Sequence, residues 1–242
     1  MRIVKTSQAP TRGRYHHGDL RNALLEKALE LVAARGQEGF SLREAARAVG
    51  VSATAAYRHF ADKTAILTAL AKEGHARLAS AMERAAAKVP GPAGGKAHAI
   101  GKLRAIGEVY VEFAVKNPSH FRVMFSPCMQ NEGFGPDDPT DADAFQILVE
   151  TLDELVVAGA VRAEARAGAE IIAWSAVHGL AGLLVEGALP LSARERAVAI
   201  AMVTRAVLLS LGSDPALVPA PAVVVSGDPR AGGKVRPARA VP

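Results

Sequence analysis

The sequence predicts an all-α protein built from two helical domains. Apolar residues recur every three or four positions along most of the chain, whereas the alternation typical of strands is absent before the C-terminal tail. Residues that favour helix starts and glycines that favour helix ends stand at the limits of these segments. A 242-residue chain that is 50% apolar can bury a substantial core, which excludes a disordered protein.

Four parts are expected along the chain: a flexible basic arm at 1–18, a first helical domain at 19–65, a larger helical domain at 66–212, and a disordered tail at 213–242. The tail is rich in proline and glycine and has no helical period. Two interpretations of the arm stay open. Its Arg12-Gly13-Arg14 segment could enter a minor groove, or it could have no fixed site.

Helix signals place the elements of both domains. Asp19 is the expected N-cap of the first helix, which ends at Gly36, and Ser41 with Glu44 has the spacing of a capping box. Asp62 is the expected cap of the helix that opens at Lys63. The expected helices are 19–36, 42–49, 52–60, 63–88, 96–117, a short one from Pro118, 140–158, 164–186 and 193–211, the last with a capping box at Ser192 and Glu195.

Two of these helices, 42–49 and 52–60, flank the three-residue turn Gly50-Val51-Ser52. Glycine allows a tight turn, and the small residues Ala46 and Ala56 let the two helices cross closely. This arrangement predicts a helix-turn-helix, in which the second helix enters the major groove of DNA.

The side chains of the second helix have the distribution that such an insertion needs. At 100° per residue, Ala53, Ala56 and Phe60 face the core, and Thr54 and Arg58 project farthest outward. An arginine can donate two hydrogen bonds to guanine, and a threonine can meet a thymine methyl or a base edge. The remaining candidates flank these positions and suit phosphates or close approach to DNA: Ser41, Ser52, Ala55, Tyr57, His59 and Lys63.

Formal charge supports the same interpretation. The first 75 residues hold twelve Lys and Arg against seven Asp and Glu, whereas the remainder holds seventeen of each. The net charge of +5 therefore comes from the part that contains the helix-turn-helix. This asymmetry is typical of a module that binds a polyanion.

The segment FSLREAARAVGVSATAAYRHFADKTAILTAL resembles the DNA-binding domain of TetR/AcrR transcriptional regulators over about residues 19–70. The resemblance implies that Ser41, Ser52, Tyr57, His59 and Lys63 contact the DNA backbone and that Ala53, Thr54, Ala55 and Arg58 lie nearest the bases. Position 56 departs from the pattern, because alanine stands where leucine is usual. RYHHGDLR and the Trp174–Gly179 segment are similar to regulators of this family with a Trp-His-Gly type C-terminal domain.

The second domain concentrates aromatic side chains and methionines between residues 100 and 186. Apolar walls with a few polar groups are typical of a ligand pocket, but they are equally typical of a packed core. The resemblance implies a small apolar effector bound between these helices. The candidate ligand-binding residues are Tyr110, Phe113, Met124, Phe125, Trp174 and His178.

The helices expected at 164–186 and 193–211 are apolar on more than one face, so each must be buried on several sides. They either form the centre of the monomer core or pair with a second copy. We expect the second, since one recognition helix reads few base pairs and a two-fold dimer supplies two.

Other classes of protein are not expected. The single cysteine, Cys128, has no partner within the chain, which favours a reducing, cytoplasmic compartment. The longest uncharged apolar run, 171–185, is shorter than a membrane span. Neither a catalytic motif nor a metal-ligand spacing occurs, so we expect no enzyme, no metal and no cofactor.

The sequence thus predicts a DNA-binding transcriptional regulator, a ligand-responsive repressor that binds a pseudo-palindromic, double-stranded operator as a homodimer. Two alternatives stay open. The protein could bind DNA constitutively without an effector, or it could be a helical small-molecule-binding protein without DNA function.

Overall fold

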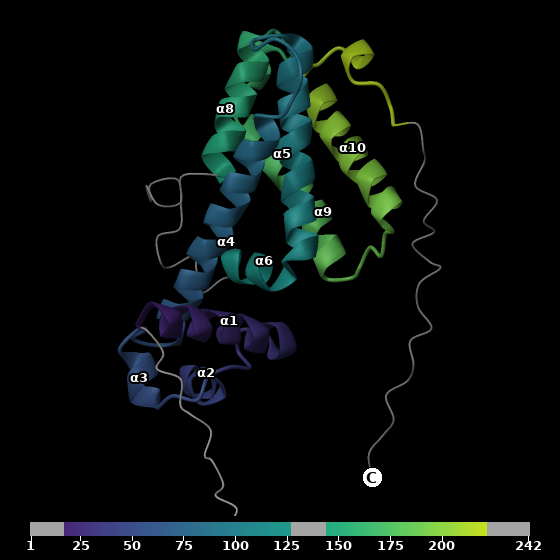
Figure 1. Ribbon diagram of the computed structural model, residues 1–242. Coiled ribbons are helices and arrows are strands. Elements are labelled where there is room, and N and C mark those ends of the chain that lie inside the picture. The colour runs from purple at the N-terminus through teal and green to yellow at the C-terminus, as the bar shows by residue number, and fades with distance from the viewer. Residues whose placement is uncertain (1–16, 127–143, 222–242) are drawn as a thin grey trace, which may run out of the picture. The chain divides into compact units, whose positions relative to one another are not determined.

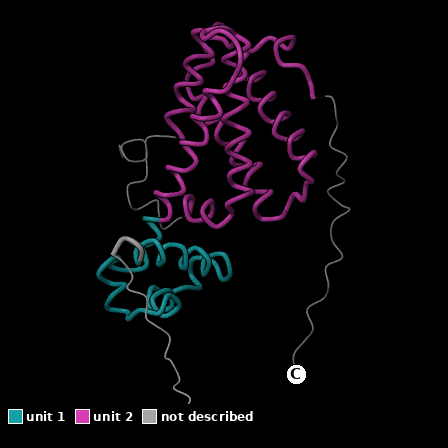
Figure 2. Tube along the Cα trace, viewed as in Figure 1, with its two compact units in different colours: residues 1–69 teal, residues 70–242 magenta. Residues whose placement is uncertain are grey.

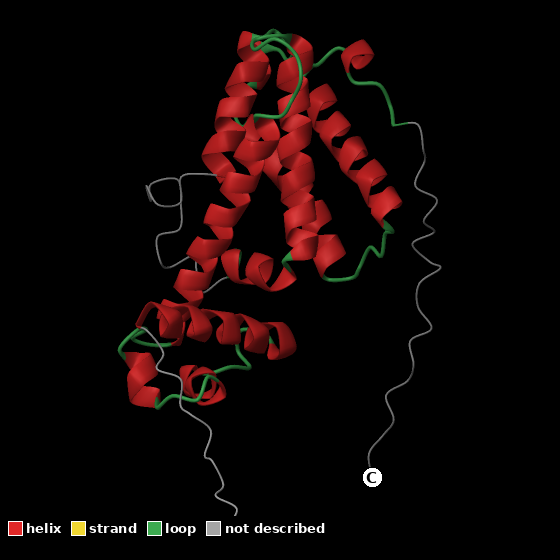
Figure 3. Ribbon diagram, in the orientation of Figure 1, coloured by secondary structure: helices red, strands yellow, loops and turns green. Residues whose placement is uncertain are grey.

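The computed structural model of the chain describes residues 17–126 and 144–221 (Figure 1). Every regular element within these two ranges is helical, and neither contains a strand (Figure 3). The predicted all-α fold class is confirmed. The chain divides into two compact units, residues 1–69 and 70–242 (Figure 2).

The first unit contains α1 (His17–Arg35), α2 (Leu42–Ala48), α3 (Ala53–Tyr57) and the start of α4 (Lys63–Ala86), which continues into the second unit. Its helices pack around side chains that are almost completely buried. These are Leu24, Leu25, Ala28, Val32, Phe40, Leu42, Ala45, Ala46, Ala56, Phe60, Ile66 and Leu67.

The helix limits of the first unit follow the expected signals with two corrections. Gly36 ends α1 with a φ of 74°, and Asp62 Oδ1 accepts from the Ala65 N–H at 2.8 Å at the start of α4. Asp19 is not the N-cap of α1, because helical backbone already begins at His17. The third helix ends at Tyr57 rather than at residue 60, so the recognition helix is shorter than predicted.

In the second unit, α5 (Lys96–Lys116) packs against four other helices (Figure 1). These are α6 (Pro118–Met124), α8 (Ala144–Val157), α9 (Ala169–Val185) and α10 (Ala193–Ser210). Helices α9 and α10 also pack against each other. Because its neighbours surround it, α5 is buried at Leu103, Ile106 and Val111.

The capping box that opens α10 is confirmed, since the Glu195 N–H donates to Ser192 Oγ at 3.3 Å and the Ser192 N–H donates to Glu195 Oε2 at 2.9 Å. Asn117 precedes Pro118 as expected for the start of α6. Its side chain does not cap that helix, because Asn117 Nδ2 donates to the Phe113 carbonyl at 3.0 Å.

Helix α9 begins later than predicted. The 3₁₀ turn η1 (Ala163–Ala165) occupies the expected first turn, and Gly168 stands before α9 with a φ of 75°. A left-handed residue interrupts α-helical hydrogen bonding, so one continuous helix from residue 164 is not possible. The expected start of α8 at residue 140, the basic arm up to residue 16 and Cys128 lie outside the described residues.

The chain beyond α10 turns back against the second unit. After the 3₁₀ turn η2 (Pro215–Leu217), Val218 is completely buried and its carbonyl accepts from Arg205 Nε at 2.8 Å. Packing therefore extends past the expected domain limit at residue 212. No helix in the described ranges is both long and apolar enough to cross a lipid bilayer.

Candidate nucleic-acid interface and effector site

The turn between α2 and α3 has the geometry that the helix-turn-helix requires. Gly50 has a φ of 78°, a conformation that side chains disfavour, and its N–H donates to the Arg47 carbonyl at 3.1 Å. Ala46 and Ala56 are buried and allow α2 and α3 to approach closely. The turn and the small residues predicted from the sequence are therefore confirmed.

Helix α3 exposes the side chains that were predicted to project outward. Thr54, Tyr57 and Arg58 are exposed, whereas Ala56 and Phe60 are buried. Arg58 is the C-cap of α3 and keeps right-handed helical angles, so its position still follows the helix. The remaining candidates of this segment, Ala53, Ala55 and His59, are half-buried.

Ser41 and Ser52 both act as helix caps. Ser41 Oγ accepts from the Glu44 N–H at 3.3 Å, and Ser52 Oγ accepts from the Ala55 N–H at 3.2 Å. Ser41 Oγ also lies 3.4 Å from Glu44 Oε2, which accepts the hydroxyl proton. The hydroxyl proton of Ser41 is thus already donated within the cap. Ser52 is exposed and retains a hydroxyl proton to donate.

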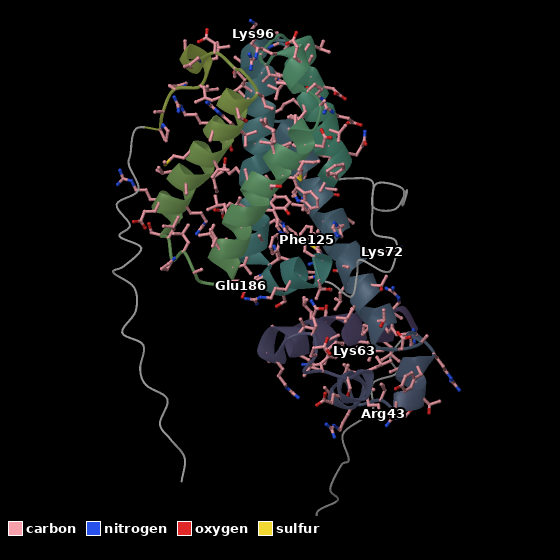
Figure 4. All side chains as sticks on the ribbon, turned by 180° about the vertical axis from the view of Figure 1, so that it is seen from behind. Arg43, Lys63, Lys72, Lys96, Phe125 and Glu186 are labelled. Atoms are coloured by element: carbon pink, nitrogen blue, oxygen red, sulfur yellow. The ribbon has the colours of Figure 1, made fainter. Side chains whose placement is uncertain are left out.

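Lys63 opens α4 and carries an ion pair. Its Nζ lies 3.2 Å from Glu38 Oε2 and 5.9 Å from the centre of the Phe40 ring (Figure 4). Glu38 is 97% exposed at its side chain, so the pair is open to solvent. A phosphate that approaches Lys63 has to compete with this carboxylate.

A second candidate site lies inside the second unit, where residues from α5 and α9 form hydrogen bonds. Trp174 Nε1 lies 3.1 Å from Tyr110 Oη, and the same oxygen lies 2.8 Å from His178 Nδ1. Trp174 and His178 stand one helical turn apart on α9. The two helices therefore supply one hydrogen-bonded group of three side chains.

Aromatic rings surround these three side chains, among them that of Phe125, which is labelled in Figure 4. The His178 ring centre lies 4.7 Å from that of Phe125 and 5.2 Å from that of Phe121, which lie at the end of α6 and within it. Phe145 of α8 lies 5.8 Å from Trp174. We call Tyr110, Phe121, Phe125, Phe145, Trp174 and His178 the aromatic cluster.

Burial sets the protonation of the cluster. It raises the pKa of Tyr110 above its ordinary value, and it lowers the pKa of His178 below its ordinary value. Tyr110 is therefore a phenol and His178 a neutral imidazole at pH 7.

Only four of the six candidate ligand-binding residues meet in this cluster. Phe113 is buried in the core and makes none of the ring contacts found among the described residues. Met124 instead packs against α4 at Gly74. A Cβ added to this glycine would lie only 2.6 Å from Met124 Sδ. Phe121 and Phe145 belong to the cluster but were not among the predicted ligand-binding residues. Their aromatic side chains are evident in the sequence, but their place beside Tyr110, Trp174 and His178 depends on tertiary packing.

These features define a helix-turn-helix DNA-binding protein with a second helical unit. The family model "Bacterial regulatory proteins, tetR family" matches residues 24–70, and the model "Tetracyclin repressor-like, C-terminal domain" matches residues 103–207. The chain belongs to the TetR family of transcriptional regulators.

Solved structures share this fold. A protein with unknown function from Rhodococcus sp. RHA1 is 27% identical, with a TM-score of 0.67 over 84% of this chain and 100% of its own. A tetR-family regulatory protein from Rhodococcus RHA1 is 19% identical, with a TM-score of 0.61 over 81% and 98%. The TetR-family regulator PfmR from Thermus thermophilus is 22% identical, with a TM-score of 0.56 over 78% and 97%. No curated protein matches the sequence.

Proposed function

We propose that this TetR-family regulator is a ligand-responsive repressor that acts in the cytoplasm and binds a pseudo-palindromic operator as a homodimer. The observation that carries the proposal is the exposed polar surface of α3, where Thr54 and Arg58 project beside a turn of helix-turn-helix geometry. Side chains of this type in this position suit the major groove.

The contacts within the DNA interface divide into two kinds. Arg58 and Thr54 would read base edges, with the small residues Ala53 and Ala55 allowing close approach. The backbone contacts would come from the hydroxyls and basic groups around α3, because these suit phosphate oxygens. They are Ser41, Ser52, Tyr57, His59 and Lys63, of which Ser41 would act through its place in the cap.

A second copy would cover the apolar surface of α9 and α10. On α9, Ile171, Ile172 and Leu183 are 64%, 47% and 50% exposed, and Met202 on α10 is 48% exposed. Gly179 lies on the same side of α9, and a Cβ there would meet nothing within 4 Å. Exposed apolar residues gathered on two adjacent helices support an interface of four helices, two from each copy.

The effector would bind at the aromatic cluster, which combines apolar walls with three polar side chains. Binding there would favour one arrangement of the dimer over another, and this difference in affinity would change operator binding.

The test of the DNA proposal uses an operator selected from a random duplex pool by the wild-type protein. Arg58→Ala should weaken binding to this operator by about 1 to 3 kcal/mol and relax base preference, because the arginine reads a base. Arg84→Ala, which removes the same charge from an exposed site in the second unit, should leave base preference unchanged. Equal losses on selected and random DNA for Arg58→Ala would contradict base reading.

The same material separates the alternatives. A thermal shift with library compounds, together with loss of operator binding, supports the ligand response. Operator binding that no compound changes would favour a constitutive DNA binder. Failure to retard any duplex at low salt would favour a small-molecule-binding protein without DNA function.

A further inference from the structure

The hydrogen bonds of the aromatic cluster determine which atoms donate. An indole N–H can only donate, so Tyr110 Oη accepts from Trp174 Nε1 at 3.1 Å. The phenol keeps its own proton, because burial raises the pKa of Tyr110. The oxygen could accept a second hydrogen bond, but the phenol proton then has no partner among the described residues. The arrangement that pairs every proton has Tyr110 Oη–H donating to His178 Nδ1, 2.8 Å away.

The hydrogen bond from Tyr110 sets the tautomer of His178. A neutral imidazole that accepts at Nδ1 carries its proton on Nε2. Burial lowers the pKa of His178, which favours the neutral ring. His178 therefore presents an Nε2–H donor, and no partner for this donor occurs in the part of the chain that the structure describes.

Aromatic rings lie around the His178 ring. The ring centres of Phe125, Phe121 and Trp174 lie 4.7, 5.2 and 5.9 Å from that of His178. Within residues 17–126 and 144–221, the ring contacts and hydrogen bonds of the cluster include no lysine, arginine or carboxylate, and the further histidine among them is His75, whose ring centre lies 5.6 Å from that of Phe125. The cluster contacts therefore hold no permanently charged side chain.

We propose that the effector is an uncharged, largely apolar molecule with a hydrogen-bond acceptor such as a ketone or ester carbonyl, and that His178 Nε2–H donates to it. This inference rests on the proposed effector site. A hydrocarbon without an acceptor would cover the Nε2–H and leave it unpaired, which costs binding free energy. A carboxylate would lose its hydration without gaining a lysine or arginine partner.

The tautomer can be tested without a ligand. In protein labelled with ¹⁵N-histidine, the His178 signals, assigned by their loss in His178→Gln, should show a protonated Nε2 and an unprotonated Nδ1. Tyr110→Phe should remove this preference, because the ring loses the donor to Nδ1. A protonated Nδ1 in the wild-type protein would overturn the proposal.

The ligand class can be tested with cyclic ketones from cyclohexanone to cyclododecanone. Each ketone is compared with the cycloalkane of the same ring and with its carboxylate derivative. Trp174 is the chain's single tryptophan and belongs to the cluster, so its fluorescence reports binding. At least one ketone should bind about tenfold more tightly than its cycloalkane and its carboxylate.

Variants assign this preference to His178. His178→Phe keeps an aromatic ring but removes the donor, so the ketone should lose its advantage over the cycloalkane. His178→Gln supplies an amide N–H and should retain part of the advantage. His98→Phe makes a similar replacement at a half-buried histidine outside the cluster and should change neither affinity.

The outcomes separate this inference from the proposed function. Equal affinity for ketones and cycloalkanes would overturn the hydrogen-bond assignment and leave the effector site standing. Tightest binding of the carboxylates would overturn the uncharged class in the same way. If no probe of the three sets binds while operator binding is intact, the effector site and this inference both fail, and the DNA proposal survives.

Discussion

The two units of the protein differ in what they leave exposed. In the first unit, the outward side of α3 is polar, with Thr54 and Arg58 exposed and Tyr57 43% exposed. In the second unit, α9 and α10 expose large apolar side chains, among them Ile171 and Leu183. A polar, hydrogen-bonding surface suits DNA, whereas an exposed apolar surface suits another protein surface.

The two units position their exposed and clustered side chains through interactions of different sequence range. The first unit orients its side chains through local contacts, such as the Ser52 cap and the turn at Gly50. The second unit builds the aromatic cluster from α5, α6, α8 and α9. Substitutions in the two units should therefore change different measured properties.

The largest effect is expected at the apolar surface of the second unit. Leu183→Glu should convert the proposed dimer to a monomer, because a charge cannot be buried there without a partner. Loss of the second DNA-binding unit should then weaken operator binding by about 100-fold or more. Light scattering measures the mass, and a gel shift measures the affinity.

Val157 gives a matched control for this prediction. It is 86% exposed on α8, outside the surface of α9 and α10. Val157→Glu introduces the same charge in place of an exposed apolar side chain and should leave the protein dimeric. If Leu183→Glu also stays dimeric, the proposed interface is wrong.

A smaller, uniform effect is expected at Lys63 in the first unit. Lys63→Ala should weaken binding to operator and random DNA several-fold alike, because it would remove the proposed phosphate contact. It should also lower the slope of log affinity against log salt by about one. Binding titrations at several salt concentrations measure both quantities. A loss confined to the operator would show that Lys63 reads sequence.

A still smaller effect, of opposite sign, is expected at Glu38. In the proposed complex its carboxylate would compete with DNA for Lys63, whose Nζ lies 3.2 Å from Glu38 Oε2. Glu38→Gln should strengthen binding to both kinds of DNA by about twofold, since exposed ion pairs are weak. In a Lys63→Ala background the same substitution should have less effect. An equal gain in both backgrounds would mean that Glu38 acts through general charge only.

The smallest effect is expected in the pH dependence of the second unit's stability. Burial lowers the folded-state pKa of both His178 and His120 from 6.5, so the unfolded chain binds protons at these sites more readily. Their contribution to stability is complete above pH 6.5 and is lost as the pH falls toward the folded-state values. Thermal melts across this range should give a lower melting temperature at acid pH.

His178→Gln provides the control for this pH dependence. Glutamine does not titrate, so the variant should lose less of its melting temperature between neutral and acid pH than the wild-type protein does. Identical slopes in the variant and the wild-type protein would exclude a role for His178.

Much of the first unit could be predicted from the sequence. The capping box at Ser41, the turn at Gly50 and the outward position of Arg58 all follow from short spacings along the chain. Helix ends were less predictable, as at Asp19 and at the end of α3. Several residues near an end can adopt either helical or turn backbone at similar free energy.

In the second unit, the sequence predicted helices and an aromatic composition, but not which side chains meet. Tyr110 and His178 are 68 residues apart and form a hydrogen bond of 2.8 Å, whereas Phe113, on the same helix as Tyr110, lies in the core. Met124 packs against Gly74 because α4 approaches it closely, and no local sequence pattern indicates this approach.

Caps, turns and the helical period act over a few residues, so the helical fold class, the helix-turn-helix and the exposed surface of α3 could be predicted from the sequence. The membership of the aromatic cluster and its hydrogen-bond partners became visible in the folded protein. They depend on how helices that are distant in the chain pack together, which the periodicity of the sequence does not encode.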